Sequence, residues 1–106
     1  MSKKKEFIKY DNDKPRIDLI PPEILLELGN LYAIGAKKYA DRNWELGTEW
    51  GRYYSALQRH LLRWWSGETR DPENGQHHLI AVIWNAIALK FYEDNKLGKD
   101  DRGIKK

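Results

Sequence analysis

Apolar residues recur at helical spacing in three stretches of the chain, which we expect to form helices at about residues 23–39, 49–66 and 71–95. The first stretch follows Pro21 and Pro22, and proline suits the first turn of a helix. The second carries an aromatic stripe between Trp50 and Trp65. No segment shows the alternation that is typical of a strand. The pattern therefore predicts an all-α fold, a small bundle of three main helices.

The third stretch is apolar on almost every side. Asp71 is expected to be its N-cap and Pro72 its first helical residue. Between residues 79 and 92, only Asn85 and one lysine interrupt the apolar side chains. A helix with this pattern is expected to lie at the centre of the core, packed on several sides. Gly67 is expected to end the helix before it.

Length and composition favour a single domain. The chain has 106 residues, of which 41% are hydrophobic, and this suffices for one core. We expect one domain over residues 1–106, with an ordered core at about residues 10–95, a basic tail at residues 1–9 and a second, frayed one at residues 96–106. The N-terminal residues contain no long apolar run. We therefore expect neither a signal peptide nor a membrane partner, and predict a cytoplasmic protein.

The distribution of charge argues against nucleic-acid binding. The net charge is +3, but residues 1–16 hold six basic against three acidic residues, and residues 96–106 hold five against two. The body between them has eight basic and eleven acidic residues. A duplex-binding face would need an excess of basic residues in the body, whereas basic tails are commonly solvated ends. A nucleic-acid partner is therefore not expected.

Histidine and amide side chains concentrate between residues 59 and 85. His60 lies at the flank of the aromatic stripe, where a histidine suits either a cavity wall or a structural role. His78 and Asn85 are two helical turns apart and share one face of the third helix. Buried polar groups of this kind either bond to neighbouring side chains or face a ligand. The sequence leaves both possibilities open.

Three carboxylates fall within six residues at the turn between the second and third helices: Glu68, Asp71 and Glu73. Anionic groups so close together repel unless a cation or several donors join them. Asp71 can also be explained as a cap, and Glu73 as a favourable charge in a first helical turn. The chain contains no cysteine, so a bound metal would need oxygen or imidazole ligands.

Basic and aromatic residues elsewhere could complete a nucleotide site. Arginine and lysine are the natural partners of phosphate oxygens, and aromatic rings offer surfaces on which a base can stack. Tyr39 and Trp44 are the candidate stacking residues. The candidate phosphate ligands, whose charges could equally be solvated helix ends, are Lys14, Arg16, Lys38 and Arg59.

Several motifs occur in a fixed order, namely KPR, LIPP, GAKKY, NW, a helical RH, GE, DPENG, HH and a helical WN. In this order they resemble the phage-associated dATP/dGTP diphosphohydrolase N-terminal family, over about residues 10–92. The resemblance implies a small all-α domain similar to the MazG-like nucleotide pyrophosphohydrolases, which are often oligomeric. It implies cleavage of a purine deoxynucleoside triphosphate to the monophosphate and pyrophosphate. A homo-oligomer in the host cytoplasm is the corresponding expectation.

The resemblance also suggests roles for individual residues. Mg²⁺ or Mn²⁺ would be held by Glu68, Asp71 and Glu73. The catalytic residues would be His60, Glu68 and Glu73, with His60 or Glu73 as the base that activates water. The nucleotide would be bound by Lys14, Arg16, Lys38, Tyr39, Asn43, Trp44, Arg59, His78 and Asn85.

One departure from the MazG pattern keeps a second function open. MazG-like enzymes usually carry an ExxE pair on one helix and an ExxD pair on the next, but the second helix of this chain has no ExxE. The only ExxD in the candidate site runs from Glu68 to Asp71, at a turn. A protein that binds and sequesters a nucleotide without cleaving it is the alternative. A third possibility is a structural helical module without a nucleotide ligand.

Overall fold

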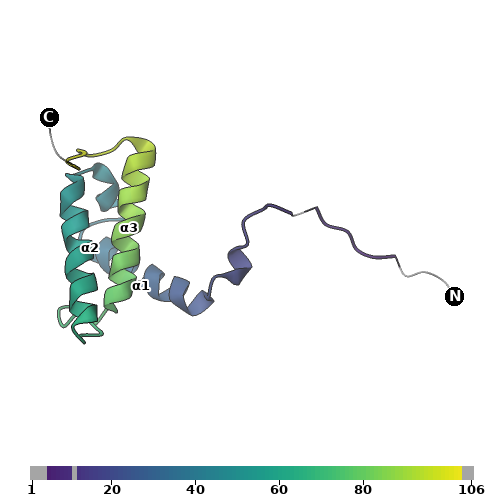
Figure 1. Cartoon of the computed structure of the whole chain (residues 1–106), viewed down its shortest axis with the longest axis horizontal. Coiled ribbons are helices and arrows are strands. Elements are labelled where there is room, and N and C mark those ends of the chain that lie inside the picture. The colour runs from purple at the N-terminus through teal and green to yellow at the C-terminus, as the bar shows by residue number, and fades with distance from the viewer. Residues whose placement is uncertain (1–4, 11, 104–106) are drawn as a thin grey trace.

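The computed structural model describes residues 5–10 and 12–103. Its helical elements, in chain order, are η1 (Ile17–Leu19), α1 (Pro22–Lys38), η2 (Asn43–Leu46), α2 (Trp50–Trp65) and α3 (His78–Asn95). Figure 1 shows α2 and α3 side by side, with the chain before α1 projecting away from them. Within the described residues there are only two isolated bridges and no strand. The predicted all-α fold with three main helices is confirmed, while completion by oligomerisation stays a prediction.

Helix α3 forms the centre of the bundle, as its nearly uninterrupted apolar sequence predicts. It packs against both α2 and α1. Most of the buried side chains belong to it, among them Ile80, Ala81, Ala88 and Tyr92. The Tyr92 hydroxyl donates a hydrogen bond to the backbone carbonyl of Trp44 and so ties η2 to the core. Burial of the α3 side chains is the main apolar contribution to stability that the structure shows.

Helices α1 and α2 begin and end within one residue of the predicted positions. Pro22 is the first residue of α1, where its missing N–H costs nothing. After α2, Gly67 adopts a φ of +106°, and its N–H donates to the Trp64 carbonyl. A left-handed glycine at this position ends a helix without strain, as predicted.

The predicted start of the third helix at Asp71 is wrong, because α3 begins at His78. Asp71 and Pro72 do start a turn, but Gly75 leaves it with a φ of +74°, which a continuing helix cannot accept. The N-cap of α3 is His77, whose side chain accepts a hydrogen bond from the Leu79 N–H at 3.0 Å. The glycine in DPENG therefore outweighs the Asp-Pro start signal.

Residues 96–103, which follow α3, are held against the bundle and are not frayed. Lys99 exchanges backbone hydrogen bonds with the chain around the start of α2, with its carbonyl 2.9 Å from the Trp50 nitrogen and its nitrogen 3.1 Å from the Thr48 carbonyl. The Trp50 indole also donates to the Leu97 carbonyl at 2.8 Å. The expectation of a frayed tail is therefore wrong for this segment. Residues 104–106 and 1–4, which also belong to the predicted basic tails, lie outside the described residues.

Many apolar side chains stay exposed on the described surface. Phe7 is 90% exposed, Leu26 70% and Trp65 79%. The apolar face of α3 that includes Val82 and Ile83 borders open space. No helix in the described part of the chain combines the length and the apolar character that a membrane crossing needs.

Candidate functional site

Two histidines from different helices meet inside the bundle. His60 lies on α2 and His78 is the first residue of α3, and their Nδ1 atoms are 2.9 Å apart. On the other side of the His78 ring, Nε2 lies 2.7 Å from Glu68 Oε1. The His78 side chain has no exposed surface, whereas that of Glu68 is 45% exposed. The three side chains therefore form a path of polar contacts from the surface into the bundle.

Hydrogen-bond chemistry limits where the protons of this path can lie. An ionised Glu68 carboxylate can only accept, so His78 donates from Nε2. A neutral His78 then has no proton on Nδ1, and His60 must donate from its own Nδ1. A doubly protonated His78 would instead donate on both sides. In either case Glu68 fixes the orientation of the His78 ring.

The surroundings of His60 lower the pKa of its imidazole below the ordinary value. Burial is the largest cause, because an apolar environment disfavours the charged ring. The charges on His78, Arg59 and Arg63 act in the same direction, while that of Asp71 opposes them. His60 therefore stays neutral at neutral pH.

Asp71 is the third titratable side chain at this point. It is only 8% exposed, and its Oδ1 accepts a hydrogen bond from the Glu73 N–H at 2.9 Å. One potential ligand atom from each of His60, Asp71 and His78 lies within 4.8 Å of the other two. In the part of the chain that the structure describes, this is the one group of three such side chains that is close enough to share a metal ion. We call these three residues the His–Asp–His cluster.

The loop between α2 and α3 holds Asp71 in place. The Asp71 N–H donates to the Gln76 carbonyl at 2.8 Å, and the His78 N–H donates to the Thr69 carbonyl at 3.0 Å. The Gly75 N–H closes the turn onto the Asp71 carbonyl at 2.7 Å. The DPENG motif thus folds back on itself and delivers a carboxylate beside the first residue of α3.

The three predicted metal carboxylates do not come together in this arrangement. Asp71 faces the two imidazoles, whereas Glu68 contacts the far side of His78. Glu73 is exposed, and its backbone N–H donates a hydrogen bond to Asp71. The predicted metal-binding and catalytic roles of Glu68 and Glu73 stay predictions.

Asn85 is buried, as the apolar surroundings in the sequence indicate, and is 5% exposed. Its Nδ2 donates to the Ala81 carbonyl one turn earlier on α3, at 2.8 Å. This bond satisfies one donor of the amide within the helix itself. A role for Asn85 in nucleotide binding stays a prediction.

A cavity of about 270 Å³ lies between α1, η2, α2 and α3. This volume lies just below the roughly 300 to 1,000 Å³ of pockets that hold whole drug-sized ligands. It therefore suits one nucleobase, with its single or fused rings, rather than a whole nucleotide. Asn43 lines the cavity and offers an amide for hydrogen bonding. The aromatic residues of its wall are Tyr32, Tyr39, Trp44, Tyr53 and Trp84. We call this space the aromatic cavity.

The rings of the aromatic cavity support one another. The Trp84 ring centroid lies 6.0 Å from that of Trp44 and 5.6 Å from that of Tyr53. Burial raises the pKa of the Tyr53 and Tyr32 hydroxyls above the ordinary value, so both stay neutral at neutral pH. Flat, uncharged aromatic surfaces of this kind can stack on a nucleobase.

The aromatic cavity and the His–Asp–His cluster lie along the same face of α2. Tyr53, in the cavity wall, and His60, in the cluster, are seven residues apart. This separation is two helical turns, or about 10 Å along the helix axis. The cavity and the cluster therefore lie along one side of α2, with no residue of the cluster lining the cavity.

Two predicted phosphate ligands belong to the helical bundle. Arg59 is next to His60 on α2, and its Nη1 donates to Ser55 Oγ at 2.9 Å. Lys38 is the last residue of α1, and its Nζ lies 5.2 Å from the centroid of the Tyr39 ring, at the edge of the aromatic cavity. Both cations are exposed and free to meet an anionic ligand.

Lys14 and Arg16 lie apart from the candidate site. They belong to the segment before α1, which projects away from the bundle in Figure 1. Arg16 also forms an ion pair with Asp18 at 2.8 Å, and both side chains are well exposed. The structure therefore does not bring these two predicted phosphate ligands to the cavity of the same chain.

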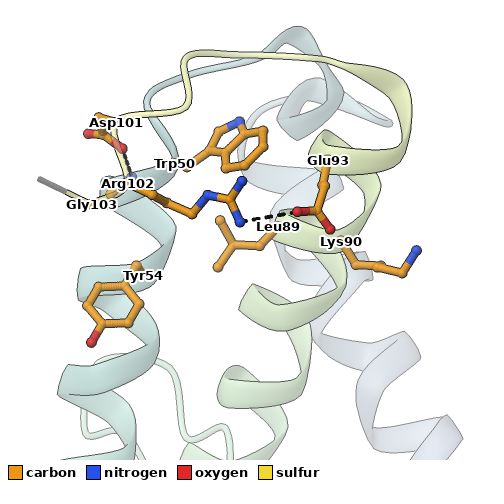
Figure 2. A pocket seen from close by; sticks show the side chains of 9 residues that line it. Trp50, Tyr54, Leu89, Lys90, Glu93, Asp101, Arg102 and Gly103 are labelled. Atoms are coloured by element: carbon orange, nitrogen blue, oxygen red, sulfur yellow. Dashed lines mark hydrogen bonds and ion pairs between the residues drawn. The ribbon is translucent and has the colours of Figure 1, made fainter. Parts of the chain in front are cut away.

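A larger cavity of about 650 Å³ lies near the other end of α2. Figure 2 shows the side chain of Arg102 between Trp50 and Glu93. The guanidinium lies 4.7 Å from the Trp50 ring centroid and 3.2 Å from a Glu93 carboxylate oxygen. Trp50 precedes His60 by ten residues, or about 15 Å along the helix. None of the predicted site residues lines this cavity, so we place the candidate site at the cluster and the aromatic cavity.

The residues missing from the sequence prediction are Tyr32, Tyr53 and Trp84. The first two carry the spacing of core residues, and the apolar pattern alone cannot distinguish a core aromatic from one that lines a cavity. Trp84 stands beside Asn85 in the helical WN motif, which was the available signal. The cavity depends on the gap between α1 and η2, which the sequence does not specify.

Known proteins resemble this chain over most of its length. Residues 4–102 match the family described as dATP/dGTP diphosphohydrolase, N-terminal. A dATP/dGTP diphosphohydrolase of Salmonella phage PMBT28 is 32% identical over 95 residues, which make up 90% of this chain and 32% of that protein. The chain thus spans about a third of the length of this relative, and no solved structure matches it. Because the family match extends over nearly the entire sequence, the chain belongs to the dATP/dGTP diphosphohydrolase N-terminal family.

Proposed function

We propose that this chain binds a purine deoxynucleoside triphosphate and hydrolyses it to the monophosphate and pyrophosphate. Family membership and the name of the phage relative support a dATP/dGTP diphosphohydrolase activity. The observation that carries the proposal is the position of the aromatic cavity two helical turns from the His–Asp–His cluster. The first offers a place for a base and the second a polar centre for the phosphates.

The base would stack on the rings of the aromatic cavity. Stacking on an aromatic side chain contributes roughly 1 to 3 kcal/mol per base. Asn43 lines the same cavity, and its amide could hydrogen-bond the edge of a purine. A purine has two fused rings and gains more from such a wall than a pyrimidine does, which is consistent with the dATP/dGTP specificity named for the relative.

Hydrolysis breaks the anhydride bond between the α- and β-phosphates with water, and a base accepts the proton of that water. Charge developing on the phosphate oxygens must be neutralised, and the exposed cations Lys38 and Arg59 are the residues proposed for this role. Of the two predicted bases, His60 belongs to the buried cluster, whereas Glu73 is exposed beside it. His60 can act as the base only where its imidazole does not bind the metal ion; otherwise Glu73 is the remaining predicted base.

Metal dependence, with Mg²⁺ or Mn²⁺, is part of the proposal. Mg²⁺ prefers an octahedral set of oxygen ligands, including water and phosphate. The cluster supplies one carboxylate and two imidazoles, a set that fits Mn²⁺ better than Mg²⁺ because imidazole suits transition metals. Glu68 and Glu73 lie beside this set without joining it.

The test is a product analysis with each of the common deoxynucleoside triphosphates. The protein is incubated with dATP, dGTP, dCTP or dTTP and with MgCl₂ or MnCl₂, and the products are resolved by ion-exchange chromatography. We expect dAMP or dGMP in equal amounts with pyrophosphate, at a rate well above that for the pyrimidine nucleotides. Formation of inorganic phosphate and a diphosphate instead would refute the proposed reaction.

A second candidate function is nucleotide binding without cleavage. Helix α2 contains no acidic residue between Trp50 and Trp65, so it cannot supply one of the two carboxylate pairs that are typical of MazG-like enzymes. The aromatic cavity and the basic residues would still bind the ligand. Recovery of intact nucleotide from denatured protein, after incubation with either metal, supports this function over hydrolysis.

A further inference from the structure

The contact between His60 and His78 has a geometry that two nitrogen ligands of one metal ion share. Their Nδ1 atoms are 2.9 Å apart, in rings tilted by 45° whose centroids are 5.1 Å apart. Two imidazole nitrogens that bind one ion at about 2.1 Å and at right angles to each other lie about 3 Å apart. The observed separation therefore matches two neighbouring positions of a coordination shell.

The contact of His78 with Glu68 follows a pattern common to metal-bound histidines. A histidine that binds a metal through one nitrogen usually donates its other N–H to a carboxylate or carbonyl, which fixes the ring and its tautomer. Glu68 lies 2.7 Å from Nε2 and leaves the Nδ1 lone pair directed towards His60. Because His78 is fully buried, this carboxylate determines how its ring is oriented.

Asp71 completes a mixed set of three ligands. It is nearly buried, and the folded DPENG turn holds its backbone through hydrogen bonds from the Gly75 N–H and to the Gln76 carbonyl. A ligand atom of Asp71 lies within 4.8 Å of those of both histidines. Its Oδ1 accepts a hydrogen bond from the Glu73 N–H at 2.9 Å, and its remaining oxygen lone pairs could bind a cation.

From these observations we propose that His60, Asp71 and His78 bind one divalent transition-metal ion, with Glu68 as the positioning residue for His78. This inference deepens the proposed function and rests on it only for the use of the ion in catalysis. In this arrangement His60 is a ligand, so the base that accepts the proton of water is Glu73, the other predicted base. The site differs from the three-carboxylate set that the sequence suggests.

The ligand types indicate which ions bind. Two imidazoles and one carboxylate suit Zn²⁺ and Co²⁺ best and bind Mn²⁺ less tightly, whereas Mg²⁺ prefers oxygen ligands alone. We therefore expect Mn²⁺ and Co²⁺ to bind the protein without nucleotide, and Mg²⁺ to bind at least tenfold more weakly. The number of sites should be one per chain.

Isothermal titration calorimetry with MnCl₂ and with MgCl₂, on protein without a histidine tag, measures this directly. His60→Gln is expected to abolish Mn²⁺ binding, and Glu68→Gln to weaken it about 10- to 100-fold. His77→Gln is the matched control, because His77 is the neighbouring histidine and lies outside the cluster. Binding that is equal in His60→Gln and His77→Gln, or no binding of Mn²⁺ by the unaltered protein, overturns the proposal.

A second measurement uses only the unaltered protein, so its result does not depend on whether a variant folds. In nuclear magnetic resonance spectra of the unaltered protein, one equivalent of the diamagnetic ion Zn²⁺ should shift the ring signals of His60 and His78 and leave those of His77 in place. Equal shifts of all three rings show adventitious binding and overturn the proposal. Selective shifts support it even if no nucleotide is hydrolysed. Hydrolysis that persists without any Mn²⁺ binding at the cluster would overturn the metal site and leave the proposed function standing.

Discussion

The aromatic cavity can be blocked without damage to the fold by a substitution at Gly35. Gly35 lies within α1 and lines the cavity, and a Cβ added there meets nothing within 4 Å. Leucine at this position would place four carbon atoms in a space of about 270 Å³ and exclude a purine ring. Gly29 is the matched control, since it lies in the same helix, is exposed, and has equally open space around its Cβ.

The substitution at Gly35 should stabilise the fold and weaken nucleotide binding. Glycine in a helix is less favourable than alanine or leucine by roughly 0.5 to 1 kcal/mol, so both Gly35→Leu and Gly29→Leu should raise the free energy of unfolding by about that amount. For a chain of this size the melting temperature rises by roughly 3 to 6 °C. Loss of base stacking costs about 1 to 3 kcal/mol of binding, which is about a 5- to 150-fold weaker affinity for Gly35→Leu alone.

Calorimetric titration with a dATP analogue that has a methylene bridge between the α- and β-phosphates measures the affinity without hydrolysis. Thermal unfolding of the same samples measures stability. We expect Gly29→Leu to bind like the unaltered protein and Gly35→Leu to bind much more weakly, although both are at least as stable. If Gly35→Leu binds the analogue as tightly as Gly29→Leu, the base does not occupy the aromatic cavity.

Three further predictions concern stability and assembly. Tyr92→Phe leaves the Trp44 carbonyl without its hydroxyl donor and should lower the free energy of unfolding by about 1 to 3 kcal/mol in urea titrations; no change would show that water replaces the hydroxyl. The pKa of Glu49 is lowered to about 2, chiefly by its own backbone N–H and then by Thr48 and Arg52, so its stabilising effect is full above about pH 4.5 and is lost as the pH falls towards 2. The difference in melting temperature between the unaltered protein and Glu49→Gln should therefore shrink over that range, and a constant difference would contradict the assignment. Light scattering after size exclusion should show a homo-oligomer, and Ile83→Lys on the open apolar face of α3 should shift it towards monomer, whereas a monomer at all concentrations contradicts self-association.

Helix positions could be predicted where local signals and packing agree. Pro22 and Gly67 mark their helix ends through backbone geometry that no tertiary contact needs to enforce. At Asp71 two local signals compete, since Asp-Pro favours a helix start and the glycine four residues later favours a turn. The hydrogen bond from the Asp71 N–H to the Gln76 carbonyl decides for the turn, and that bond exists only in the folded loop.

The candidate site could be predicted in its residues but not in its arrangement. The sequence identifies His60, Asp71 and His78 as candidates, yet it joins Asp71 to the other carboxylates because they are close along the chain. The structure joins it to the imidazoles, because the packing of α2 on α3 sets which side chains meet. Periodicity gives the face of each helix but not the rotation and offset between two helices.

The contacts of the residues after α3 also could not be predicted from the sequence. Asp101 accepts a hydrogen bond from the Gly51 N–H at 2.9 Å, and a Cβ at Gly51 would lie 2.8 Å from that carboxylate. The composition of residues 96–106, which is mostly charged, gives no sign of this contact. It arises because the first N–H groups of α2 need acceptors, and the returning chain supplies them for Trp50 and Gly51.

The proposed reaction breaks the bond between the α- and β-phosphates of a purine deoxynucleoside triphosphate. Samples are taken during incubation with dGTP and MnCl₂, and a chelating resin removes the paramagnetic Mn²⁺ from each. Phosphorus nuclear magnetic resonance of these samples follows the bond directly, because pyrophosphate, inorganic phosphate and each nucleotide phosphate give separate signals. We predict that the three dGTP signals decline while those of dGMP and pyrophosphate grow at equal rates. Unchanged dGTP signals, in protein that calorimetry shows to bind the nucleotide, would contradict hydrolysis and identify a sequestering protein.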